Sequence, residues 1–174
     1  MAQIDDAAAQ LTEVRTRLAA LEKGRHAIMN AFELHPLPTV HLAALQARVR
    51  DESEIRDATA ELLARLRSHL VRRGATGADI TLTYDGTAED VIVVTAGTVP
   101  GAGPHGLDVI TVPGAAHGVS VRFDAPPADT GDAWVALDSH LAEEGLATTG
   151  VYRQTLTGEG GVVLQAPVRE LPRP

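Results

Sequence analysis

The stretches SHLVRRG (residues 68–74) and SHLAEEG (residues 139–145) share one frame, S-H-L-x-x-x-G, and lie 71 positions apart. The second copy carries two glutamates where the first carries two arginines. Residue n can be laid over residue n + 71 from Ser68 onward without a gap through the next two predicted strands. Recurrence at a fixed spacing is typical of a duplicated structural unit. The chain of 174 residues is therefore predicted to contain two copies of one unit.

Apolar residues recur every three or four positions ahead of the glycine in each copy, which is the period of an amphipathic helix. They predict one helix over about 52–73, ended by Gly74, and a second over about 129–144, ended by Gly145. Glycine just past a helix adopts the left-handed conformation of a C-cap without strain. Both units are thus predicted to end their helix in the same way.

Each predicted helix is followed by two predicted strands. The first strand alternates between apolar and polar residues, and the second is rich in β-branched residues, as half-buried and fully buried strands are. The four strands are expected at 79–84, 90–97, 149–156 and 161–168, with turns at 85–90 and 157–161. A short further strand precedes the first strand of each unit, and Pro38 falls on Pro113.

Together these elements predict an α+β fold made of a duplicated β-α-β-β unit. Residues 31–100 would form the first repeat and residues 104–174 the second, joined through the Gly- and Pro-rich segment 97–106. Two such units pair their strands in one antiparallel sheet, with two helices and a central groove at the seam. Duplication creates this groove, and divergence of the copies makes it asymmetric.

A separate helix is predicted over 3–30, ahead of the repeats. Apolar residues there follow the a and d positions of about three heptads, interrupted at Arg25. We expect residues 1–30 to form a linker helix that joins two chains in a coiled-coil homodimer. The alternative is a helix packed on its own domain.

Composition narrows the classes of function. The net charge is −8, whereas a protein that binds DNA directly usually has a basic surface. There is no cysteine and no long apolar run, and the acidic N-terminus does not have the pattern of a signal peptide. We therefore expect a cytoplasmic protein that makes no contact with a membrane.

The duplicated unit resembles the GyrI-like effector-binding domain over residues 32–171. The resemblance depends on the helix pattern W-x-x-L-x-x-x-L-x-E-x-G (134–145), followed by VY (151–152) and a strand ending LQAPV (164–168). It implies a small-molecule sensor of the kind found in drug-sensing MerR-type and AraC-type regulators. The helix 3–30 is similar to the MerR linker helix, so contact with DNA is expected only through a domain absent from this chain.

The resemblance also implies which residues line the groove. Four of the five aromatic residues, Tyr84, Phe123, Trp134 and Tyr152, lie in elements that the family uses for its pocket. Aromatic faces suit flat or cationic ligands. The alternative is that these residues belong to the core.

Strand alternation places Arg153 and Thr155 on one face, and Tyr152, Gln154 and Leu156 on the other. Many relatives carry a glutamate where this chain has Arg153, so a preference for cations is in doubt. An Arg153 that faces the groove would favour a carboxylate, phosphate or phenolate, whereas an Arg153 that faces solvent would have no role there. Thr155 falls on Tyr84 in the 71-residue alignment. Both are retained as predicted ligand-binding residues.

The sequence gives little support for a metal site or for a catalytic site. The histidines lack metal-ligand spacing, and no serine occurs in a G-x-S-x-G turn. We therefore predict no metal, no cofactor and no catalytic residue. The expected function is binding of a small aromatic effector. The alternatives are a stand-alone GyrI-like drug-binding protein or hydrolase, and a protein-binding, gyrase-inhibitor-like protein.

Overall fold

The computed structural model describes residues 32–101 and 106–172, and only six separate positions ahead of them (13, 15, 16, 18, 19 and 22). The helix predicted for residues 3–30, and with it the coiled coil, lies outside the described residues apart from these positions.

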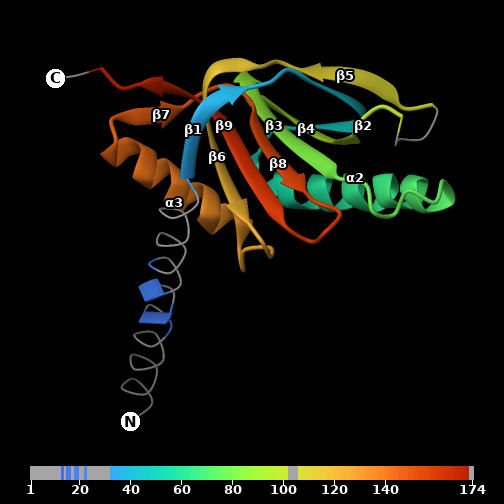
Figure 1. The fold of residues 1–174 in the computed structure, drawn as a ribbon, viewed down its shortest axis with the longest axis horizontal. Helices are drawn as coiled ribbons and strands as arrows, with labels where there is room; N and C mark the ends of the chain where they lie inside the picture. Colours follow the sequence, from blue (N-terminus) through green and yellow to red (C-terminus); the bar gives the residue numbers. More distant parts are fainter. Residues whose placement is uncertain are drawn as a thin grey trace, which may run out of the picture.

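These residues form two helices and nine strands (Figure 1). In chain order the elements are β1 (Phe32–Leu37), β2 (Val40–Val49), α2 (Glu52–Arg72), β3 (Ile80–Ala88), β4 (Val91–Thr98), β5 (Asp108–Val112), β6 (Ala115–Phe123), α3 (Thr130–Glu143), β7 (Leu146–Thr148), β8 (Tyr152–Leu156) and β9 (Val162–Glu170). The predicted α+β class is confirmed. In the part of the chain that the structure describes, no helix has the length and apolarity needed to cross a membrane.

The strands form one antiparallel sheet in the order β1-β6-β9-β8-β3-β4-β2-β5, with β7 paired to β9. The element order strand, strand, helix, strand, strand occurs twice, with β7 inserted after α3. The two copies meet at the centre of the sheet, where β3 pairs with β8. The seam expected from the repeat therefore lies between these two strands.

The gap-free alignment of residue n with residue n + 71 does not hold for the two strands at this seam. Because β7 and a turn precede β8, the strands are shifted by one residue relative to the helices. Tyr84 lies opposite Tyr152, and Thr155 pairs with Thr81 instead. Since successive side chains of a strand point to opposite faces, Tyr84 and Thr155 lie on different faces of the sheet.

The helix ends follow the sequence prediction. Asp51 caps the start of α2, where its side chain accepts a hydrogen bond from the Ser53 amide, and Asp129 caps the start of α3 by accepting one from the Asp132 amide. Gly74 and Gly145 follow the two helices with φ of 70° and 74°. Both glycines therefore have the left-handed conformation expected of a C-cap.

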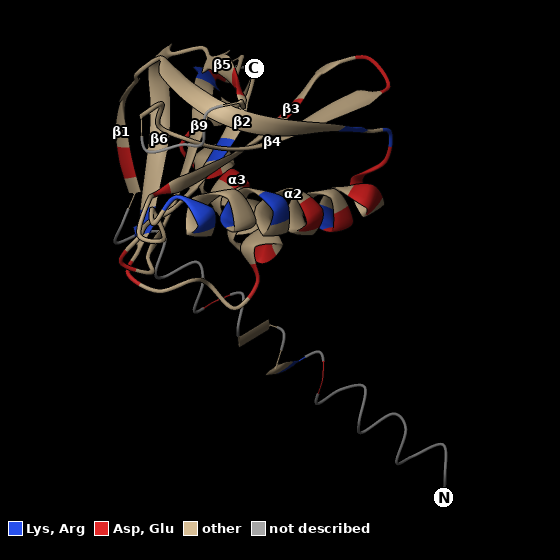
Figure 2. Ribbon diagram, turned by 90° about the vertical axis from the view of Figure 1, so that its right-hand side faces the viewer, with Lys and Arg blue, Asp and Glu red and all other residues tan. Residues whose placement is uncertain are grey.

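Both helices cover the same face of the sheet (Figure 2). Leu62, Leu66 and Leu70 of α2 pack with the inner residues of β3 and β4, while Leu137 and Leu141 of α3 pack with those of β6 and β9. These leucines are at most 2% exposed. Each repeat thus builds its own apolar core between a helix and its half of the sheet.

The other face of the sheet is crossed by an antiparallel ribbon. β1 continues into β2, and β5 continues into β6, while Leu37 lies opposite Ala115 and Val40 opposite Val112. The chain passes in this way between the two ends of the sheet (Figure 1). We call residues 37–40 and 112–115 the strap.

Arg153 of β8 lies beneath the strap and is only 2% exposed. Its Nη1 donates a hydrogen bond to the Pro38 carbonyl at 2.8 Å, and its Nη2 donates to the Pro113 carbonyl. Among the described residues it forms no ion pair. Burial lowers the pKa of its guanidinium. Arg153 therefore joins the equivalent turns of the two repeats to the centre of the sheet.

Candidate ligand-binding groove

A groove of about 820 Å³ lies on the helix-covered face of the sheet, at the seam of the repeats. Its floor is formed by β3 and β8, and its walls by residues 52–63 of α2 and 129–138 of α3. Each wall comes from the N-terminal half of its helix. The central groove expected from the duplication is therefore present between the two helices.

Three aromatic side chains line this groove. Tyr84 and Tyr152 are cross-strand partners on its floor, and Trp134 reaches it from α3. Trp134 and Tyr152 pack edge to face, with ring centroids 4.9 Å apart and an interplanar angle of 90°. All three rings are only partly buried. They offer aromatic surface to a flat or apolar ligand, at about 0.5–1.5 kcal/mol for each favourable ring contact.

A chain of hydroxyl groups leads from these rings to a carboxylate. The hydroxyl of Tyr152 lies 2.5 Å from Thr148 Oγ1, and Thr148 donates a hydrogen bond to Asp138 Oδ1 at 3.0 Å. Asp138 lines the groove one helical turn after Trp134. Burial raises the pKa of the Asp138 carboxyl, and the bond from Thr148 opposes that rise. A cation bound beside Asp138 would favour its charged form.

The walls of the groove carry more negative than positive side chains. Among the described lining residues three are acidic, Glu52, Asp129 and Asp138, and one is basic, Arg56. The groove therefore has an excess of carboxylates beside its aromatic rings. This combination favours organic cations, whose charge meets the carboxylates and whose apolar surface meets the rings.

Gln154 occupies the middle of the floor. It pairs with Leu82 across the seam, and its side chain is 8% exposed. The family's glutamate was assigned by sequence to position 153, but alternation along β8 turns residue 154, and not 153, toward this groove. Gln154 therefore occupies the central polar position, where it presents a neutral amide.

The structure separates the predicted ligand-binding residues into two sets. Tyr84, Trp134 and Tyr152 line the groove. Phe123 lies outside the lining and packs on the core beside Trp134. Arg153 and Thr155 lie on the opposite face, so Arg153 has neither of the two orientations considered from the sequence.

Asp138 and Gln154 were missed as candidates from the sequence. The spacing of four residues between Trp134 and Asp138 places both on one face of a helix and could have indicated the first. The alternation along β8 already placed Gln154 on the face of Tyr152. What the sequence did not reveal was which of the two faces carries the groove.

The fold is that of the GyrI-like effector-binding domains. Solved structures of this class align with nearly the whole described chain at low sequence identity. At such identities the likeness establishes the fold and leaves the ligand open.

Three solved proteins represent these similarities. SAV2435, solved with tetraphenylphosphonium bound, has a TM-score of 0.60 and 13% identity over 79% of this chain and 93% of its own. An integron cassette protein from the mobile metagenome of Vibrio cholerae has a TM-score of 0.59 and 10% identity over 80% and 96%. The C-terminal domain of EcmrR has a TM-score of 0.52 and 14% identity over 80% and 98%.

EcmrR bound to DNA also matches, with a TM-score of 0.51 and 18% identity over 97% of this chain and 68% of EcmrR. No protein-family model matches the sequence, and a search of curated proteins finds no significant match.

Proposed function

We propose that the chain is the effector-binding part of a MerR-type transcription regulator, and that a small aromatic molecule binds in the groove between α2 and α3. The observation that carries the proposal is the cluster of Tyr84, Trp134 and Tyr152 on the floor and wall of a groove at the repeat seam. EcmrR, which was solved bound to DNA, supports the regulatory part by its likeness in fold over 97% of this chain.

The charge around the groove supports a lipophilic cation as the ligand class. Three carboxylates face one guanidinium, and Asp138 lies within one helical turn of Trp134. Tetraphenylphosphonium, which SAV2435 binds, belongs to this class. The absence of a glutamate at position 153 does not weaken the proposal, because that side chain lies on the other face of the sheet.

The first test is equilibrium dialysis of the full chain against tetraphenylphosphonium, with mass spectrometry of the recovered compound. We expect saturable binding and recovery of the compound unchanged. Ala128→Trp places a bulky ring at the groove rim and should weaken binding at least about tenfold, which is about 1.4 kcal/mol. Ala142→Trp, at an exposed position of α3 outside the groove lining, should bind as the wild type does.

The same experiment distinguishes the alternative functions. Chemical conversion of compounds that bind in the groove would favour the hydrolase. Failure of tetraphenylphosphonium and of matched neutral and anionic aromatic compounds to bind would favour the protein-binding, gyrase-inhibitor-like protein.

The remaining parts of the proposal concern partners. Residues 1–30 would pair two chains, and an attached DNA-binding domain would respond when ligand binding shifts the population of conformations. Dimerisation stays a prediction, because the helix concerned lies outside the described residues. The cytoplasmic location expected from the sequence is part of the same proposal.

A further inference from the structure

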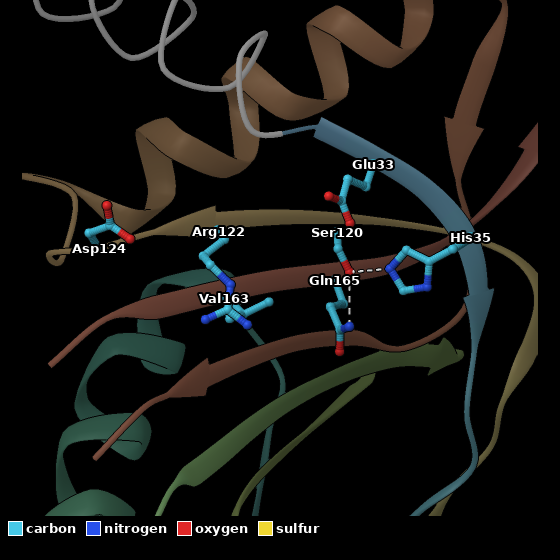
Figure 3. A pocket seen from close by; sticks show the side chains of 7 residues that line it. All are labelled: Glu33, His35, Ser120, Arg122, Asp124, Val163 and Gln165. Carbon is cyan, nitrogen blue, oxygen red and sulfur yellow. Dashed lines mark hydrogen bonds between the residues drawn. The ribbon is translucent and has the colours of Figure 1, made fainter. Parts of the chain in front are cut away.

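A second pocket lies on the face of the sheet opposite the groove (Figure 3). It has a volume of about 510 Å³ and is formed by the edge strand β1 with β6 and β9. Figure 3 shows His35, Ser120 and Gln165 directed toward one another from these three strands. The binding function proposed above uses none of the three.

The hydrogen bonds fix the role of each group. His35 Nδ1 lies 2.8 Å from the Pro36 carbonyl oxygen, which can only accept, so Nδ1 carries the proton of the neutral ring. His35 Nε2 is then an acceptor, and it lies 2.6 Å from Ser120 Oγ. Gln165 Nε2 donates to the same oxygen at 2.9 Å. The Ser120 hydroxyl therefore donates its proton to His35.

This arrangement has the geometry of an activated nucleophile. A serine within hydrogen-bond reach of a histidine, which is itself oriented by a third group, is the signature of nucleophilic catalysis. Ser120 is 9% exposed and lines the pocket, so a small molecule that enters the pocket can reach it. Arg122 lines the same pocket two residues along β6. Gln165 and Arg122 both carry N–H donors and both line this pocket, where such donors can stabilise a developing oxyanion.

We propose that Ser120 and His35 form a catalytic dyad that hydrolyses small esters in this pocket. Ser120 Oγ attacks the ester carbonyl carbon while its proton passes to His35 Nε2. The bond to the alcohol oxygen breaks, and that oxygen takes the proton from His35. Water then attacks the acyl-serine and gives a proton to His35, which returns it to Ser120 Oγ as the acid leaves. The sum is ester plus water to acid plus alcohol.

The pocket also indicates the substrate. Its volume suits a small acyl group, and its walls carry both signs of charge, Glu33 and Asp124 beside Arg122. The two carboxylates outnumber the one guanidinium and disfavour an anionic acyl group, so the proposed substrate is a small ester with an uncharged acyl group. p-Nitrophenyl acetate is a suitable probe of this class.

The test is covalent labelling of the full-length protein with a fluorophosphonate. In that reaction Ser120 Oγ bonds to phosphorus, the P–F bond breaks, and fluoride leaves with the serine proton. We expect tandem mass spectrometry to find the label on Ser120 in preference to the exposed Ser68 and Ser139. His35→Gln should slow labelling about 100-fold, because general base catalysis contributes at least that much.

His41→Gln is the matched control. His41 Nδ1 lies 3.1 Å from Thr111 Oγ1, so it is also a histidine bonded to a hydroxyl, but it lies outside this pocket. This variant should label as the wild type does. Ser120→Ala should abolish saturable hydrolysis of p-nitrophenyl acetate.

Labelling of Ser68 or Ser139 as fast as Ser120 would overturn the proposal, as would an unchanged rate in His35→Gln. Circular dichroism checks that each variant is folded. If a variant does not fold, the labelled position in the wild type decides the question by itself. Binding in the groove is measured separately, so either proposal can fail without the other.

Discussion

Replacement of Arg153 by alanine is expected to lower the free energy of unfolding by about 3 kcal/mol, because two hydrogen bonds from a charged donor are lost and each such bond contributes about 1.5–3 kcal/mol. Both bonds end on the strap, at the Pro38 and Pro113 carbonyls, and the side chain is 2% exposed. Truncation would leave the Pro38 and Pro113 carbonyls without this donor and would leave a cavity beneath the strap. Some of this loss is offset, because a buried guanidinium is itself costly to desolvate.

Thermal unfolding measures this effect. For a chain of 174 residues, about 3 kcal/mol corresponds to a decrease in Tm of about 6–12 °C. Arg153→Lys should lie between the wild type and alanine, since one ammonium cannot donate to both carbonyls in the fixed geometry of a guanidinium. Arg48→Ala is the control, because Arg48 is an exposed arginine on β2, and it should change stability by less than about 0.5 kcal/mol.

A decrease for Arg153→Ala no larger than that of Arg48→Ala would contradict the role given to Arg153. It would mean that the strap is held by its own strand pairing and needs no donor from β8. An increase in stability would show that desolvation of the guanidinium outweighs its two bonds.

Replacement of Gln154 by glutamate is expected to raise the affinity of the groove for tetraphenylphosphonium about tenfold or more. The new carboxylate would stand on the floor of the groove, opposite Leu82 and two residues along β8 from Tyr152. Two opposite charges about 5 Å apart attract by roughly 3 kcal/mol at an effective dielectric constant of about 20. Desolvation of the carboxylate removes part of this, which leaves about 1.4 kcal/mol, or a factor of ten.

Dissociation constants from calorimetry check this prediction. Val135→Glu adds the same charge to α3 at a side chain that is 60% exposed and outside the groove lining, so it should leave the affinity nearly unchanged. Gln154→Lys should weaken binding by at least the same factor. Equal affinities for Gln154→Glu and Gln154→Lys would mean that the cation does not bind above position 154.

Much of the fold was predictable because the spacing of apolar residues in short segments distinguishes helices from strands. The two glycine-ended helices and the strands at the seam followed from apolar spacing. The strap did not, because it depends on pairing between segments about 75 residues apart, Leu37 with Ala115 and Val40 with Val112. Local patterns contain no information on such pairing.

For the site, the sequence predicted only which side chains of a strand share one face of the sheet. Alternation correctly separated Tyr152 from Arg153, but the choice of the groove face needed the position of the helices. The 71-residue alignment placed Thr155 with Tyr84, because it had no means of detecting the one-residue shift that precedes β8. Asp138 lines the groove one helical turn after Trp134, a spacing that the sequence does contain, but its hydrogen bond from Thr148 depends on the fold.

A titration of tryptophan fluorescence in the wild-type chain with tetraphenylphosphonium tests directly whether the ligand binds in the groove. Trp134 is the only tryptophan and lies in the groove wall against Tyr152, so every change in emission reports this site. We expect a saturable change in emission, with a midpoint that matches the dissociation constant from dialysis. Binding by dialysis without any change in Trp134 emission would contradict this expectation, because the ligand would then occupy a different part of the molecule.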